Sequence, residues 1–202
     1  MKLQQCGATT LGVLNQHPEI KIAVTNAHRL VYAGHGLGRL ENNGRVCEGS
    51  WAKINGKLIG VGIISFPSGA SYQGEWLEHE PHGYGVETSE LGAVFEGEFN
   101  LGEKHGFGCL TEPDGKKQVG CWSKGKREGW LLSIAAHGAP LTLREHKNDA
   151  FVGRQLDGQC EDAKRVQRQA ESVLDKARSV AAQALRYSEQ SGASGGGGSA
   201  LL

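Results

Sequence analysis

The amino-acid sequence predicts a mainly β protein, in which a single-layer antiparallel sheet of stacked β-hairpins is followed by one C-terminal α-helix. Two observations lead to this prediction. Glycine-containing motifs recur every 23 residues between positions 71 and 129, and a fixed period of this kind is typical of a repeat array. From residue 160 to residue 190 there is neither glycine nor proline, and small apolar residues are spaced three and four apart, as on one face of a helix.

Each repeat unit is expected to form one β-hairpin. The copies read YQGEWLEHEPHGYG from Tyr72, FEGEFNLGEKHGFG from Phe95 and QVGCWSKGKREGWL from Gln118. Strand side chains alternate between faces, so an aromatic, a glycine and a second aromatic share one face in the first two copies. Strand glycines leave a floor on which a neighbouring ring can lie. We expect this structural role for Gly74, Gly83, Gly85, Gly97, Gly106, Gly108, Gly120 and Gly129.

The pattern YxGEW, followed by HGxG and then a further aromatic with xGEF, resembles the MORN (membrane occupation and recognition nexus) repeat over residues 44–130. The resemblance implies an elongated antiparallel sheet of stacked hairpins that serves as a scaffold or docking groove and not as an enzyme. It also implies an association with phospholipids, and the family occurs beside lipid kinase and methyltransferase domains.

The chain divides into five predicted segments. Residues 1–43 look like degenerate repeats that cap the array, because terminal repeats turn one face to water. Residues 44–150 form the repeat array, with turn sequences FPSG and EPDG between its hairpins. A linker is expected at 151–159, an amphipathic helix at 160–190 and a flexible Gly/Ser tail at 191–202.

The helix is expected to need a surface, since an isolated helix of this composition is marginal in water. The apolar stripe along this helix, which we call the seam, consists mainly of alanine and valine. These side chains are too small to fill the core of a coiled coil, but they allow close approach to a surface of strand glycines and large rings. We expect it to fold back across its own repeats, or to exchange onto a second copy and form a homodimer. The docking residues are Ala163, Val166, Ala170, Val173, Ala177, Val180, Ala184 and Tyr187.

The aromatic residues are the candidate binding residues, because most of them lie within the repeats. One interpretation is that they only join neighbouring hairpins. The other is that their exposed edges line a groove for a helical protein partner, and both can hold together. The predicted groove residues are Trp51, Tyr72, Trp76, Phe95, Phe99 and Trp122.

Charge is balanced overall, with a formal net charge of zero, so no global field indicates nucleic acid. The array nevertheless has an acidic centre followed by a short basic stretch. Its cations could meet anionic lipid in a weak, salt-sensitive contact, or could simply be solvated loop residues. They are Lys116, Lys117, Lys124, Lys126 and Arg127.

Catalysis is not expected. No nucleophile elbow, phosphate loop or dinucleotide motif is present, and His82 and His105 recur as part of the repeat architecture. The cysteines lack metal-ligand spacing, so we expect no metal and no cofactor. Glu75 and Glu98 lie opposite the aromatics, where we expect solubility charges that tolerate charge reversal.

The function predicted from the sequence is a non-catalytic interaction scaffold that binds a helical partner, or its own helix, in the aromatic groove. Two alternatives stay open: a peripheral membrane adaptor for anionic phospholipids or phosphoinositides, and the targeting fragment of a larger enzyme such as a phosphatidylinositol phosphate kinase. No leader or membrane span is recognised in the sequence. We therefore expect a cytoplasmic location, with association to the cytoskeleton or to membranes left open.

Overall fold

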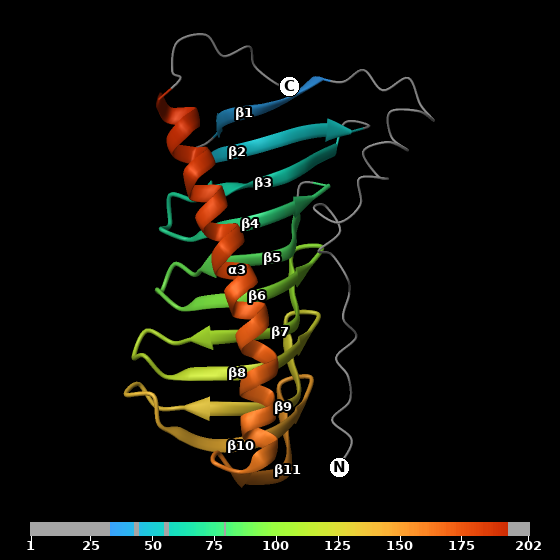
Figure 1. The fold of residues 1–202 in the computed structure, drawn as a ribbon, viewed down its shortest axis with the longest axis vertical. Coiled ribbons are helices and arrows are strands. Elements are labelled where there is room, and N and C mark those ends of the chain that lie inside the picture. The colour runs from blue at the N-terminus through green and yellow to red at the C-terminus, as the bar shows by residue number, and fades with distance from the viewer. Residues whose placement is uncertain (1–32, 43–44, 55–56, 79, 194–202) are drawn as a thin grey trace.

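The computed structural model describes residues 33–42, 45–54, 57–78 and 80–193. In this part of the chain, eleven strands form one antiparallel sheet, and each strand pairs with the next one in sequence. A single long helix lies lengthwise across the strands on one face of the sheet (Figure 1). The predicted fold class, a sheet of successive hairpins with one C-terminal helix, is confirmed.

The elements follow the chain without a crossover. They are β1 (Ala33–Asn42), β2 (Arg45–Ile54), β3 (Lys57–Ser65), β4 (Ser71–Leu77), β5 (Glu80–Thr88), β6 (Val94–Asn100), β7 (Glu103–Thr111), β8 (Lys117–Ser123), β9 (Lys126–Ile134), β10 (Pro140–Lys147), β11 (Ala150–Asp157) and α3 (Glu161–Ala193).

Tight turns hold successive hairpins to one another. Leu101 and Gly102 both have positive φ, 47° and 82°, as a two-residue hairpin turn of matching twist requires. The backbone amide of Gly102 donates to the carbonyl of Pro81 in the preceding hairpin (2.8 Å), and the amide of Gly125 donates likewise to Lys104 (2.9 Å). Each of these turns is therefore fixed to the hairpin before it.

Two segment boundaries differ from the prediction. The segment expected as a linker, 151–159, continues the sheet as β11, in which Leu156 pairs with Leu143 of β10. β11 lacks the repeat motif, and its register is interrupted near Gly153, which has a φ of 85°. Its sequence therefore shows no periodic pattern from which the strand could be predicted. The helix extends to Ala193, and residues 33–42 of the predicted cap form β1. Residues 1–32 and 194–202 lie outside the described part.

The helix matches the sheet in length. Its 33 residues span about 50 Å at about 1.5 Å per residue, and ten intervals between eleven strands span about 48 Å at about 4.8 Å each. α3 accordingly contacts every strand from β1 to β9. It lies across its own sheet, which is one of the two arrangements predicted for it.

Candidate partner surface

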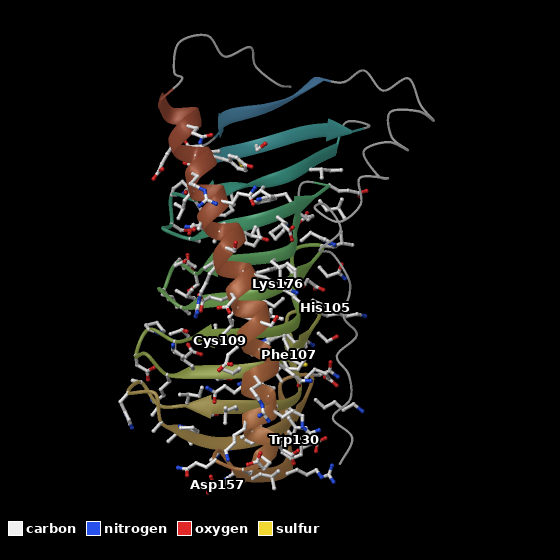
Figure 2. The ribbon with its side chains drawn as sticks, in the orientation of Figure 1. His105, Phe107, Cys109, Trp130, Asp157 and Lys176 are labelled. Atoms are coloured by element: carbon white, nitrogen blue, oxygen red, sulfur yellow. The ribbon has the colours of Figure 1, made fainter. Side chains whose placement is uncertain are left out.

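The two faces of the sheet carry different side chains. On β9, Leu132 packs with Ala163 and Val166 of α3, whereas its neighbour Leu131 packs with a cluster of rings. Neighbouring strand residues point to opposite faces, so α3 and the rings lie on opposite sides. We call the two sides the helix face and the aromatic face, and Figure 2 shows Phe107, Cys109 and Trp130 beside α3 on the helix face.

Five rings form a continuous ladder on the aromatic face. The ring centroids are 5.1 Å apart for Trp76 and Tyr72, 4.9 Å for Tyr72 and Phe99, 5.3 Å for Phe99 and Phe95, and 5.0 Å for Phe95 and Trp122. All four contacts are edge-to-face, the arrangement that the ring quadrupole favours. The indole nitrogen of Trp76 also donates to the carbonyl of Gly62 (3.1 Å).

These rings do not present exposed edges. Each is 1–5% exposed, because the rings pack against one another and against Leu131, Ile64 and Leu110. The groove predicted for Tyr72, Trp76, Phe95, Phe99 and Trp122 is therefore not open in this structure, and the prediction that α3 lies on the ring-bearing face is wrong. The side chain of Trp51 lies outside the described ones.

A row of paired glycines forms the floor under the rings. Gly74 pairs with Gly85, Gly85 with Gly97, Gly97 with Gly108, and Gly108 with Gly120. A Cβ added to Gly85 would lie 2.6 Å from Cζ of Tyr72, and one added to Gly108 would lie 2.5 Å from Cζ of Phe95. A ring lies on Gly74, Gly85, Gly97 and Gly108, as expected, whereas the side chain of Leu131 lies on Gly120.

Gly83 and Gly106 have a different role from the one predicted. Their φ angles are 63° and 60°, and each lies within a register shift of the kind that a β-bulge produces. A Cβ on Gly83 would overlap the carboxyl group of Glu75, not a ring, and one on Gly106 would overlap that of Glu98. Gly129 has a similar φ of 71°, but a Cβ there would meet nothing within 4 Å.

The bulges hold two carboxyl groups under α3, of which Glu75 is buried and Glu98 is half-buried. Glu75 is 5% exposed, and its Oε2 accepts a hydrogen bond from the backbone amide of Tyr84 (2.7 Å). Burial raises the pKa of Glu75 to about 7, against the opposing effect of that hydrogen bond. Burial likewise raises the pKa of Glu98 to about 7, with Lys176 acting in the opposite direction. The interpretation as a solubility charge is wrong for Glu75, which is buried, and Glu98 is half-buried on the face that α3 covers.

The first half of α3 is held by apolar contacts. Ala163, Val166 and Ala170 are 0–1% exposed and pack against side chains of β7 to β10. These partners are Cys109, Val119, Trp130, Leu132 and Leu143. The sequence did not identify them as a docking surface, although the alternation of apolar residues along β8 to β10 carries a weak signal of it.

The whole predicted seam of α3 faces the sheet. Six of its eight residues are buried, namely Ala163, Val166, Ala170, Val173, Ala177 and Ala184. Val180 and Tyr187 are half-buried. Ala181, which the prediction left out, is buried as well, because the stripe that meets the sheet is wider than a two-residue coiled-coil seam.

The second half of α3 adds polar contacts. Arg178 makes a bidentate pair with Glu96, with Nε to Oε1 at 2.8 Å and Nη2 to Oε2 at 3.0 Å. The ammonium group of Lys176 lies 5.2 Å from the ring centroid of Tyr84, and Ser188 donates to Glu48 on β2. Cations on α3 thus meet acidic and aromatic groups on β5 and β6.

The five basic residues do not form one surface. Lys116 and Lys117 lie where β8 begins, whereas Lys124 and Lys126 lie in and after the turn at its other end. The seven residues of β8 separate them by roughly 20 Å. Lys116 pairs with Asp114 (2.7 Å) and Arg127 with Asp149 (3.0 Å).

The repeat histidine of the first copy has a structural contact. His82 is buried, and its Nδ1 accepts a hydrogen bond from the backbone amide of Leu101 (3.3 Å). Burial, with a smaller contribution from His105, holds the pKa of His82 below its usual range. This neutral ring therefore ties one hairpin to the turn of the next.

The described residues include neither a metal-binding cluster nor a membrane-spanning helix. No group of three or more His, Cys, Asp or Glu side chains among them could hold a metal ion. No helix in the same part of the chain is long and apolar enough to cross a membrane.

Comparison with known proteins identifies the hairpin units. Three stretches match the family model of the MORN repeat, at residues 72–90, 95–117 and 119–129. They coincide with the three copies that carry the ring ladder and the glycine row. No curated protein matches the chain.

Proposed function

The chain carries MORN repeats, which suggest a protein or membrane interaction module, and from this premise we propose that it is a non-catalytic scaffold for a helical protein. The helix face of the sheet is the binding surface, and α3 occupies it when no partner is bound. The observation that carries the proposal is the fit of α3 itself. An alanine and valine seam lies along the full sheet with Ala163, Ala170, Ala177 and Ala184 completely buried.

The surface suits a helix for a physical reason. Small side chains let a helix axis approach the sheet closely. Along about 50 Å of helix, many weak dispersion contacts add up to a stable interface. A helix bound in this way is recognised by anchors on one stripe. An external helix with a similar seam would make the same contacts once α3 has left.

The test is to displace α3 and supply a helix from outside. Ala170→Glu puts a charge against the apolar cluster of β7 to β10 and should release α3. Gln169→Glu, on the exposed side of α3, is the matched control. A fluorescent synthetic peptide of residues 161–193 should bind the Ala170→Glu chain, as measured by anisotropy. It should bind the wild-type and Gln169→Glu chains far more weakly, because the tethered helix competes at an effective concentration of about millimolar.

A folded Ala170→Glu chain that does not bind the peptide would contradict the proposal. Far-ultraviolet circular dichroism verifies that the sheet persists. Ala177→Glu, at another completely buried position, replaces the first variant if that one fails to fold.

The two other functions stay proposals with less support. A membrane adaptor needs cations gathered on one side, whereas the five basic residues lie at both ends of β8 and two of them are paired with carboxylates. Sedimentation with vesicles that contain phosphatidylinositol phosphates tests it directly. The targeting-fragment proposal requires a catalytic domain in the same polypeptide, and a longer transcript would support it.

A further inference from the structure

The helix face consists of two unlike halves. Over β7 to β10 it is an apolar surface that contacts the first half of α3. Over β2 to β6 it presents carboxyl groups between apolar residues. This second half carries Glu48, Ile63, Glu75, Tyr84, Glu96 and Glu98.

The two halves of α3 are held differently as a result. Ala163, Val166 and Ala170 sit in the apolar cluster. The later half buries the small side chains of Ala177, Ala181 and Ala184 and adds the contacts of Arg178 and Lys176, of which the Arg178 side chain is 54% exposed. Ion pairs at such exposure contribute little to stability, so the end of α3 is easier to detach than its beginning.

The beginning of α3 is also fixed by its connection to β11. The amide of Gly158 lies 3.4 Å from the carbonyl oxygen of Leu141, to which it donates. A Cβ on Gly158 would lie 2.9 Å from the backbone of Leu141, so the chain passes closely against β10 before the helix starts. Release of the whole helix is therefore harder than release of its last turns.

We propose that the β2 to β6 half of the helix face is a docking surface for a partner helix that carries basic residues beside a seam of small residues. The segment of α3 from Lys176 onward is the part that such a partner displaces, while residues 161–175 stay attached. This proposal rests on the proposed function and specifies its partner.

The chemistry of the partner follows from what the surface holds. Glu96 already takes a guanidinium group in bidentate geometry, and Arg is the residue best matched to that arrangement. Tyr84 takes an ammonium group over its ring. Ala177 and Ala184 are completely buried, so larger side chains at those two positions would hold a helix away from the sheet. An acidic helix would place a like charge against Glu96.

The experiment loosens the end of α3 without touching its beginning. The full chain with Lys176→Ala and Arg178→Ala is compared with wild type and with a control that carries Lys164→Ala and Arg168→Ala, two exposed cations on the first half of α3. The probe is a fluorescent synthetic peptide of residues 172–190. Weakening the internal competitor should tighten probe binding to the first variant by about threefold and leave the control equal to wild type.

A second peptide tests whether the partner helix needs its basic residues. The same probe with Lys176→Glu and Arg178→Glu should bind at least about tenfold more weakly, and added salt should reduce the difference. Equal binding of the two peptides, or of one peptide to all three chains, overturns the proposal. The scaffold proposal is judged separately, by binding of the 161–193 peptide to the Ala170→Glu chain. It survives if that binding is seen and only the present comparison fails.

Discussion

Glycines of one repeat serve two different purposes at the scale of single residues. Gly85 and Gly108 remove side chains from beneath Tyr72 and Phe95, whereas Gly83 and Gly106 allow the left-handed backbone of a bulge. The spacing in HGxG places both kinds two residues apart, and the sequence alone does not tell them apart. The missing information is the register shift, which depends on how the paired strands meet.

Gly106 and Gly129 form a matched pair for testing the bulge. Both have a positive φ, 60° and 71°, which L residues disfavour. Alanine at either position should therefore lower the free energy of unfolding by about 1–2 kcal/mol. Gly106→Ala must in addition displace the carboxyl group of Glu98. We expect it to lower the urea midpoint more than Gly129→Ala does.

Adding Glu98→Ala to the Gly106→Ala variant should recover part of the loss, because it empties the space that the new methyl group enters. Equal midpoints for the two alanine variants would mean that the Glu98 contact contributes nothing.

Buried Glu75 predicts a pH dependence of stability. Its pKa is about 7 in the folded protein, against an ordinary value of 4.5. Between these values the folded protein keeps a proton that the unfolded chain has released. The stabilisation is therefore complete below about pH 4.5 and is lost as the pH rises through about 7.

Glu75→Gln tests this pH dependence, because glutamine stays neutral with nearly the same shape. The free energy of unfolding of wild type relative to Glu75→Gln should fall between pH 5 and pH 8. Glu103→Gln, at an exposed position, serves as the comparison. A difference between wild type and Glu75→Gln that is flat across this range would show that the carboxyl group is not buried in solution. Glu75→Lys, which we expected to be tolerated, should destabilise the fold.

At the scale of elements, the sequence predicts what is periodic. The hairpins from β4 to β9 and the helix follow from the 23-residue repeat and from the three-and-four spacing of the seam. β11 was missed because it has neither repeat motif nor strict alternation. The face chosen by α3 was also missed. Large rings suggest a docking surface, but rings that pack on one another are too buried to contact a partner. The ring packing is seen only in the structure.

The close approach of α3 to the sheet can be tested by changing one side chain. Ala177 is completely buried against the sheet, whereas Ala182 lies on the exposed side of the helix. Ala177→Leu should destabilise the protein by about 1–3 kcal/mol through overpacking. Ala182→Leu should stay within about 0.5 kcal/mol.

Amide hydrogen exchange along α3 would locate the effect of Ala177→Leu. We expect faster exchange in the helix and little change in β7 to β9. A leucine at position 177 that leaves exchange in α3 unaltered would contradict close packing there.

At the scale of the whole molecule, α3 links strands that otherwise contact only their neighbours. A sheet of successive hairpins is close to a one-dimensional array, whose ends can unfold independently. Contacts from β1 to β9 connect distant strands through one rigid element. The helix is therefore expected to make unfolding more cooperative than the sheet alone would be.

Deleting residues 160–202 should broaden the unfolding transition and lower its urea dependence, since less surface is exposed in each step. Tryptophan fluorescence reports on the rings and far-ultraviolet circular dichroism on the strands, and their midpoints should separate in the truncated chain. Coincident midpoints with an unchanged slope would show that the sheet is cooperative without its helix.

The equal lengths of helix and sheet also bear on how such a protein can grow by duplication. One further repeat would add two strands, or about 9.6 Å, to the sheet. Covering them would require about six or seven more helical residues. Seven residues are close to two full turns, so an insertion of that size returns the seam to the same side. A duplicated hairpin and an inserted pair of helical turns are thus compatible changes, whereas either one alone leaves strands uncovered or helix unsupported.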